Sequence, residues 1–294
     1  MDILTQLNRA MTYVEEHICD EVQLAEVAKV TSYSSYHFGR IFYYITDMPL
    51  SEYIRKRKLS LAAMEIQSCK VKVIDLAIKY GYDSADSFTR AFAKQHGVTP
   101  SAARQRGVSL KLFPPLTFQI KIKGVKSMNW RIEQKGEFEM FGIERIFQND
   151  ESGSVPAFWT ECHQNGEYER LLAATGRKED NNSKWRGPCL INAICGYCEP
   201  GENTFPYMIC AFLENGCNPE GFKVAKIPQN TWAVFRSDES DTIGLKIPEL
   251  FNRAYSEWMP LSGYDKAIGP DIEIYGIADS GKYYEEVWIP VKLV

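Results

Sequence analysis

The amino-acid sequence of 294 residues lacks long apolar runs. No stretch approaches the roughly 20 apolar residues that a membrane-spanning helix needs. The first residues lead into a polar, helix-periodic segment, and they have neither the basic stretch nor the apolar stretch of a secretory signal. These absences argue against a membrane partner and against secretion, so we expect a cytoplasmic protein.

Residues suited to metal binding and nucleophilic catalysis are also scarce. The sequence has four histidines, and only His163 lies beyond residue 110. Of its eight cysteines, Cys195 and Cys198 form a CxxC pair, but no second pair at similar spacing completes a four-ligand zinc site. We therefore expect structural thiols, no metal, no cofactor and no catalytic residue.

Charge of one sign does not accumulate strongly in either half of the chain. Residues 1–110 carry 14 basic and 12 acidic side chains, net +2, which leaves net −6 for the remainder of a chain whose overall charge is −4. A net charge this small does not identify a nucleic-acid-binding domain. The length exceeds what one hydrophobic core usually serves, so we expect two domains, 1–110 and 111–294.

A short helical pattern occurs twice in the first domain. The stretch SSYHFGRIF, Ser34 to Phe42, is followed 50 residues later by SADSFTRAF, Ser84 to Phe92. A shorter helical pattern precedes each copy at the distance of a helix-turn-helix corner, and a longer helix from about Ser51 joins the two pairs. This spacing predicts an all-α domain with two helix-turn-helix motifs.

Helical periodicity divides each copy into two faces. The apolar face of the first copy contains Phe38, Ile41 and Phe42, and that of the second contains Phe88, Ala91 and Phe92. The opposite faces carry polar, small or aromatic residues: Tyr36, Gly39, Arg40 and Tyr43 in the first copy, and Ala85, Asp86, Thr89 and Arg90 in the second. Both copies therefore keep one outward arginine at the same place. A solvated amphipathic helix explains either copy alone, but explains the pair less well.

Residues from about 5 to 107 resemble the DNA-binding domain of the AraC/XylS family. The similarity rests on the first motif, on the joining helix SEYIRKRKL and on IDLAIKYGYDSADSFTRAFAKQHGVTPSAAR, which is close to the family's hallmark along its whole length. The resemblance implies two recognition helices that enter successive major-groove segments, about 34 Å apart, on one face of double-stranded DNA. It also implies RNA polymerase as a partner.

The resemblance assigns DNA-binding roles to matching positions. Arg40 is suited to a bidentate contact with guanine, worth about 1–3 kcal/mol of discrimination, and Arg90 lies in the second base-reading helix. Gly39 departs from the long polar side chains often found there, and Asp86 places an acidic group beside the phosphate backbone, so both leave the target sequence open. The expected DNA-binding residues are Ser35, Tyr36, Gly39, Arg40, Tyr43, Ser84, Ala85, Asp86, Thr89 and Arg90.

Beyond residue 110 the pattern changes from helices to strands. The segment KLFPPLTFQIKI reads as a linker, because Pro114-Pro115 bars a helix, and it runs into a strand. Alternating runs follow, interrupted by two helical patterns at 155–174 and 242–260. This order predicts an α+β domain with a largely antiparallel sheet, two helices on one face and an internal pseudo-repeat.

The second half resembles the GyrI-like, or effector-binding, domain of multidrug-responsive regulators over residues 112–294. The similarity rests on Phe158-Trp159, on the turn and strand GPDIEIY and on the closing EEVWIPV. Joined to an AraC-type domain, it looks most like the Rob-type transcription activators. The resemblance implies a small-molecule effector.

Strand parity predicts where that effector binds. With Val287 and Ile289 packed toward the helices, Glu286 and Trp288 share the other face of their strand. We expect Glu273 and Tyr275 to share that helix-free face, with Tyr207 and Trp232 as further walls. Carboxylates among aromatic rings suit a lipophilic organic cation. Two other functions remain open, a hydrolase that uses Glu286 as a base and a module that sequesters a protein partner.

Overall fold

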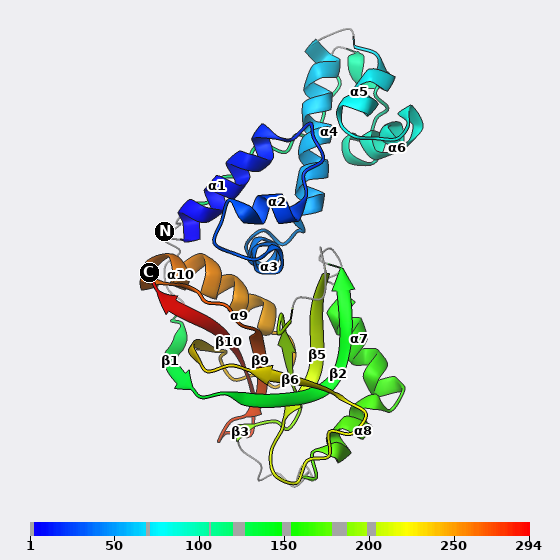
Figure 1. Ribbon diagram of the computed structural model, residues 1–294. Helices are drawn as coiled ribbons and strands as arrows, with labels where there is room; N and C mark the ends of the chain where they lie inside the picture. Colours follow the sequence, from blue (N-terminus) through cyan, green and yellow to red (C-terminus); the bar gives the residue numbers. More distant parts are fainter. Residues whose placement is uncertain are drawn as a thin grey trace. The chain divides into compact units, whose positions relative to one another are not determined.

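A computed structural model describes residues 3–68, 71–105, 107–119, 127–148, 154–177, 187–198 and 204–294. The chain divides into two compact units, one formed by Leu4–Gln119 and the other by Ile120–Val294 together with the first three residues. The regular elements described in the first unit are all helical, and the second unit is built on an antiparallel sheet (Figure 1). The expected multidomain architecture, all-α followed by α+β, is confirmed.

The first unit contains two helix-turn-helix pairs on either side of a long helix. Its elements are α1 (Ile3–Glu16), α2 (Leu24–Lys29), α3 (Ser35–Thr46), α4 (Leu50–Ser68), α5 (Val73–Lys79), α6 (Ala85–His96) and the short 3₁₀ turn η1 (Ala102–Arg104). The pairs α2–α3 and α5–α6 are the predicted motifs, and α4 joins them.

The repeat of 50 residues extends to the ends of the two recognition helices. The hydroxyl of Ser34 accepts a hydrogen bond from a backbone N–H of α3, and that of Ser84 does the same for α6. Each helix has 12 residues and ends at a left-handed residue, Asp47 with φ 55° and Gly97 with φ 79°. Because start and stop signals repeat along with the core face, both motifs fold in the same way.

Over its described residues, the second unit is built on a ten-stranded sheet whose pairings are all antiparallel. The path of neighbouring strands is β1-β7-β10-β9-β4-β5-β2-β6, with β3 paired to β9 and β8 to β10. The strands are β1 (Asn129–Lys135), β2 (Phe138–Gln148), β3 (Gly187–Pro188), β4 (Asn192–Cys195), β5 (Thr204–Phe212), β6 (Lys223–Ile227), β7 (Asn230–Arg236), β8 (Tyr264–Lys266), β9 (Asp271–Ile277) and β10 (Tyr283–Leu293).

This strand order is the predicted pseudo-repeat. Strands β2, β4 and β5 on one side of the sheet correspond to β7, β9 and β10 on the other, and the halves meet where Ile194 lies opposite Ile272. The hairpin strands are exchanged, because β1 pairs with β7 of the second half and β6 pairs with β2 of the first. Each half therefore completes its sheet with a strand from the other.

Two helical segments accompany the sheet, one at each end (Figure 1). The first is split by Gly166, which has φ 81°, into α7 (Val155–Gln164) and α8 (Glu167–Ala174). The second begins at Ile247 rather than near Thr242, as α9 (Ile247–Arg253), and continues through the π-helical turn η3 (Ala254–Trp258) into α10 (Met259–Ser262). Among the described residues, no helix is long and apolar enough to cross a membrane.

The sheet has two faces with different cores. The face that α7 and α9 cover, called here the helix face, includes Tyr207, Glu273 and Glu285. The other, called here the helix-free face, carries an apolar cluster that includes Trp232, Trp288 and Ile272. Residues directly opposite each other on paired strands share a face, so the register decides which side chains meet.

Candidate functional sites

The outward faces of the two recognition helices differ in exposure. On α6, Asp86 and Arg90 are exposed. On α3 the corresponding Arg40 is half-buried, and its guanidinium carbon lies 5.0 Å from the ring centre of Tyr44. Tyr36, Gly39 and Tyr43 on α3, and Ala85 and Thr89 on α6, are likewise half-buried. The two arginines keep the common position that the repeat predicts.

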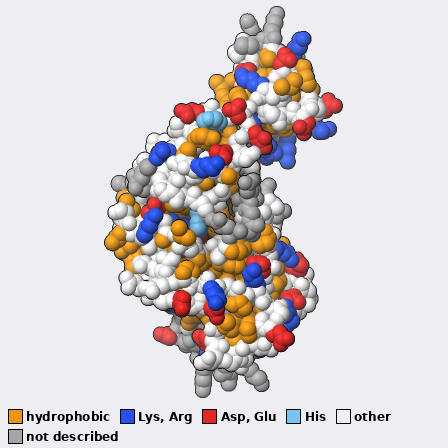
Figure 2. Space-filling view, viewed as in Figure 1, with side chains coloured by type: hydrophobic (Ala, Val, Ile, Leu, Met, Phe, Trp, Pro, Cys, Tyr) orange, Lys and Arg blue, Asp and Glu red, His pale blue; other side chains and the backbone are white. Residues whose placement is uncertain are grey.

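Two of the serines at these sites have a local structural role. The Ser34 hydroxyl lies 3.0 Å from Nδ1 of His37, and Ser84 forms a reciprocal capping box with Ser87 at the start of α6. Basic and acidic side chains are intermixed over the surface that Figure 2 shows, without a large patch of one sign. Charge alone therefore remains a weak indicator of the DNA-binding surface.

The predicted convergence of Glu273 and Tyr275 with Glu286 and Trp288 is wrong. In the register of β9 and β10, Glu286 lies opposite Ile274, whereas Glu273 lies opposite Val287. Glu273 and Tyr275 therefore occupy the helix face, and Glu286 and Trp288 the helix-free face. The error came from assigning the isoleucines of DIEIY to the helices, because isoleucine packs equally well in the second apolar core.

Glu273 is enclosed by aromatic side chains on the helix face. Its carboxylate accepts hydrogen bonds from the hydroxyls of Tyr207, at 2.8 Å, and of Tyr275, at 3.1 Å. Trp159 of α7 donates its indole N–H to the Tyr207 hydroxyl at 2.9 Å, and its ring meets that of Tyr275 edge-on at 5.6 Å. Glu273 itself is buried. A buried carboxylate thus lies beneath α7, among three aromatic rings.

The environment of Glu273 keeps the two tyrosines in their neutral form. Burial raises the pKa of Tyr207 and of Tyr275 well above the ordinary value, and the negative charge of Glu273 adds to this effect. Neutral hydroxyls donate hydrogen bonds to the carboxylate and carry no charge of their own. The site therefore combines aromatic walls with a buried carboxylate.

Glu286, in contrast, meets cations from the protein itself. Arg131 of β1 donates two hydrogen bonds to its carboxylate, at 3.0 and 3.1 Å, and Trp288 donates a third at 2.9 Å. The ammonium group of Lys135 lies 4.4 Å from the ring centre of Trp288. Trp232 is fully buried beside Trp288. Cationic side chains of the protein itself therefore lie at Glu286 and Trp288, where the sequence predicts a cationic ligand.

Glu285 has a structural task on the helix face. Its two oxygens accept four backbone hydrogen bonds, from Gly244, Leu245, Lys246 and Ile247, at 2.7–3.0 Å. These donors belong to the segment that enters α9, whose N–H groups would otherwise lack acceptors. Glu285 therefore fastens α9 to the sheet.

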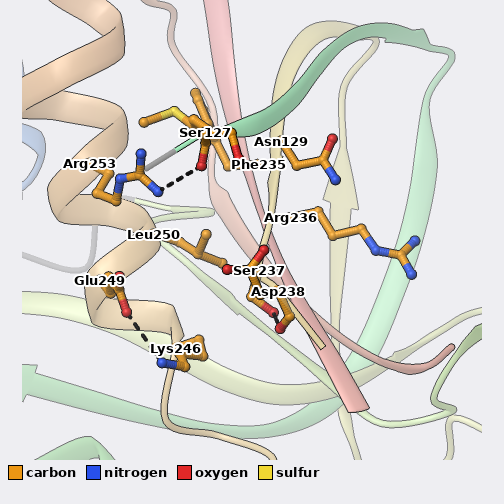
Figure 3. A pocket seen from close by; sticks show the side chains of 11 residues that line it. Ser127, Asn129, Phe235, Arg236, Ser237, Asp238, Lys246, Glu249, Leu250 and Arg253 are labelled. Carbon is orange, nitrogen blue, oxygen red and sulfur yellow. Dashed lines mark hydrogen bonds and ion pairs between the residues drawn. The ribbon is translucent and has the colours of Figure 1, made fainter. Parts of the chain in front are cut away.

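A cleft of about 240 Å³ lies between β1, β7 and α9, apart from the residues around Glu273. Figure 3 shows Phe235 and Leu250 in its wall, with the charged ends of Lys246 and Glu249 paired at 3.5 Å. Arg253 donates to the backbone oxygen of Ser127 at 3.3 Å. The charged side chains that line the cleft are of both signs and are paired in part with each other. The cleft is therefore less specific for a cation than the surroundings of Glu273.

Sequence reasoning missed Trp159, Arg131 and Lys135 as residues of these two carboxylate environments. Trp159 appeared only as a family trait, because no sequence pattern shows which strand a helical residue covers. Arg131 and Lys135 have the same parity in β1 and so share one face of that strand, but only the pairing of β1 with β7, and of β7 with β10, brings them near Glu286 and Trp288. The described cysteines Cys195 and Cys198 are a buried residue of β4 and an exposed residue beyond it.

Comparison with known proteins agrees with both halves of the structure. Residues 128–292 match the GyrI-like small molecule binding domain, and residues 27–106 match a helix-turn-helix domain. The chain belongs to the GyrI-like family. Its N-terminal unit is an AraC-type DNA-binding domain, so this GyrI-like protein is a transcription regulator of the AraC/SoxS type.

Curated relatives of this GyrI-like regulator include a transcriptional activator and a regulatory protein. The HTH-type transcriptional activator AarP of Providencia stuartii is 36% identical over 98 residues, which are 33% of this chain and 73% of AarP. Regulatory protein SoxS of Escherichia coli K12 is 36% identical over 96 residues, 33% of this chain and 90% of SoxS. Among solved structures, SAV2435 bound to tetraphenylphosphonium covers 56% of this chain and 94% of its own, with 20% identity and a TM-score of 0.44.

Proposed function

We propose that this regulator responds to a lipophilic aromatic cation that binds at Glu273, between α7 and the sheet. The observation that carries the proposal is the carboxylate itself, buried against Trp159, Tyr207 and Tyr275. A cation placed there neutralises a desolvated charge, and its aromatic groups replace contacts that α7 now makes. Binding in turn alters DNA reading by the first unit, or its contact with RNA polymerase.

Entry of such a ligand requires α7 to move, because Trp159 covers the carboxylate. The polar contacts between α7 and the sheet include that indole hydrogen bond and an exposed ion pair, Arg145 to Glu161, with both distances 2.9 Å. Exposed ion pairs contribute little to stability. The polar part of opening this side of the unit therefore costs little, and the remaining cost is apolar, since Phe158 of α7 is buried.

The test is a titration with tetraphenylphosphonium, chosen because it is an aromatic cation without hydrogen-bond donors. All six tryptophans lie beyond residue 110, so tryptophan quenching reports on the second unit. We expect saturable quenching, weakened at least tenfold by Glu273→Gln and unchanged by Glu286→Gln. Tetraphenylborate, with the same shape and opposite charge, should not bind. Equal weakening by both substitutions, or equal binding of both ions, would contradict the assignment to Glu273.

For the first unit we propose sequence-specific binding of double-stranded DNA, with Arg40 and Arg90 reading bases in successive major-groove segments. The equivalent positions of the two arginines on equally capped helices support this role. Arg90→Ala should reduce discrimination at one half-site by about 1–3 kcal/mol. Lys94→Ala, another exposed cation on α6, should weaken binding to all duplexes equally. Wild-type protein that binds every duplex equally would refute specific reading.

A further inference from the structure

The segment after η1 is packed along the first unit, although its Pro114-Pro115 pair suggests a free linker. We call residues 107–119 the strap. Gln67, near the end of α4, donates to the backbone oxygen of Val108 at 3.2 Å. Further along, the backbone N–H of Leu116 donates to the hydroxyl of Tyr53, near the start of α4, at 3.0 Å. The strap therefore runs antiparallel to the helix that joins the two motifs.

The middle of the strap is fixed by a buried charge. Arg57 of α4 is 5% exposed, and its guanidinium donates to the backbone oxygen of Phe113 at 2.5 Å and to both oxygens of Glu15 on α1, at 2.6 and 2.8 Å. The backbone N–H of Phe113 donates to the Ser60 hydroxyl at 2.9 Å. Because both the backbone N–H and the backbone oxygen of Phe113 have hydrogen-bond partners, the strap has a single position on α4.

The two ends of the strap enter different cores. Leu110 packs against the core of the second motif, which includes Phe88 and Phe92. Phe118 is 8% exposed, and its ring lies edge-on to that of Phe42, 6.2 Å away, on the apolar face of α3. The strap thus connects the two helix-turn-helix cores in addition to α4.

The Asn8 side chain forms two hydrogen bonds with the backbone of Phe118, as a neighbouring β-strand would. Its side-chain oxygen accepts from the backbone N–H of Phe118 at 2.8 Å, and its side-chain nitrogen donates to the backbone oxygen of the same residue at 3.0 Å. Two hydrogen bonds to one residue fix both its position and its orientation. Asn8 of α1 therefore holds the Phe118 ring against α3.

We propose that Phe118 positions the first recognition helix for DNA, and that the strap carries the state of the second unit to that helix. Phe118 touches the inner face of α3, whose outer face carries Arg40, and the chain leaves the strap directly for the second unit one residue later. A displacement at residue 119 acts first on the Asn8 clamp and then on α3. This inference rests on the DNA-reading role proposed above.

A double-mutant cycle in the full chain tests the positioning role. The probe is a duplex selected from random DNA with the wild-type protein. Phe118→Ala should lower its affinity about tenfold in the wild type and in the Arg90→Ala background, but less than about twofold in the Arg40→Ala background, because coupled residues lose their effect together. Phe118→Leu should retain most of the affinity. Equal losses in both arginine backgrounds would show a general loss of folding and overturn the proposal.

A second measurement tests transmission. Saturating tetraphenylphosphonium should shift the DNA affinity of the wild type, and Asn8→Ala should reduce that shift several-fold while tryptophan quenching by the cation stays unchanged. An undiminished shift in Asn8→Ala would overturn transmission through the strap. A wild type that bound the cation but showed no shift would likewise overturn transmission through the strap. A wild type that selects no duplex, or that does not bind the cation, would instead contradict the proposed function, so the two failures are distinguishable.

Discussion

The two halves of the GyrI-like unit have the same strand and helix order, but their helices meet the sheet differently. The register makes Met208 of β5 equivalent to Trp288 of β10, because each faces one of the central isoleucines. Three residues earlier in each strand, the first half has Phe205 and the second has Glu285. The clamp on α9 therefore has no counterpart under α7.

The carboxylate of the α7 half lies at a different position and has different partners. Glu273 comes from β9, which belongs to the second half, yet it is covered by Trp159 from the first. Its tyrosine donors are neutral, whereas Glu285 accepts four backbone N–H groups. The segment that enters α9 is fastened to Glu285, whereas α7 only covers Glu273. The comparison supports the proposal that a ligand enters under α7 while α9 stays in place.

The largest effect should come from removing the clamp. Glu285 is 1% exposed, so Glu285→Ala leaves four backbone N–H groups without their acceptor and should lower the free energy of unfolding of this unit by roughly 3–5 kcal/mol. Urea unfolding followed by tryptophan fluorescence measures it. Glu249→Ala, which removes an exposed carboxylate from α9, should cost less than about 0.5 kcal/mol. Comparable losses in the two variants would remove the contrast between the helices.

The next largest loss of stability should come from alkaline pH, which acts on the half of the unit that α7 covers. Burial raises the pKa of Tyr207 and Tyr275 in the folded state, so above about pH 10 the unfolded chain releases protons that the folded chain keeps. Stability supplied by these hydroxyls is complete below that pH and is lost as pH rises. The urea midpoint should fall between pH 9 and about pH 11, and less steeply in Tyr275→Phe. An equal slope in that variant would contradict the assignment.

The sequence predicted much of the first unit because its signals are local. The serine caps, the outward arginines and the apolar faces all recur 50 residues apart, and local signals of this kind do not depend on distant contacts. The strap was missed for the opposite reason. Two prolines exclude a helix, but whether Phe118 then packs on α3 depends on Asn8, which lies 110 residues away.

In the second unit, strand positions were predictable and their faces were not. Alternation located β9 and β10, but each alternating set includes apolar residues that suit either core, Ile272 and Ile274 on one side and Val287 and Ile289 on the other. Parity within one strand fixes which residues share a face, whereas the register with its neighbour fixes which face that is. Only the register therefore shows that Glu273 and Glu286 lie on opposite faces of the sheet.

A smaller effect should follow from loosening the cover over Glu273. Trp159→Phe removes one hydrogen bond to Tyr207 and should lower the free energy of unfolding by about 1 kcal/mol. Because a less stable cover opens more often, the apparent affinity for tetraphenylphosphonium should rise. The matched control is Phe251→Leu in α9, which should lower stability but leave cation affinity unchanged. Weaker cation binding in Trp159→Phe would mean that the indole contacts the ligand rather than only covering its site.

The smallest change in stability should come from Glu273 itself, in contrast to Glu285. Burying a carboxylate among apolar groups costs free energy, and the amide of Glu273→Gln still accepts from Tyr207 and Tyr275. Its unfolding free energy should therefore stay within about 1 kcal/mol of wild type or rise, although cation binding is lost. A loss as large as that of Glu285→Ala would show that Glu273 is a structural clamp too. Retained stability with lost binding would show a charge kept at a cost to folding and used for recognition.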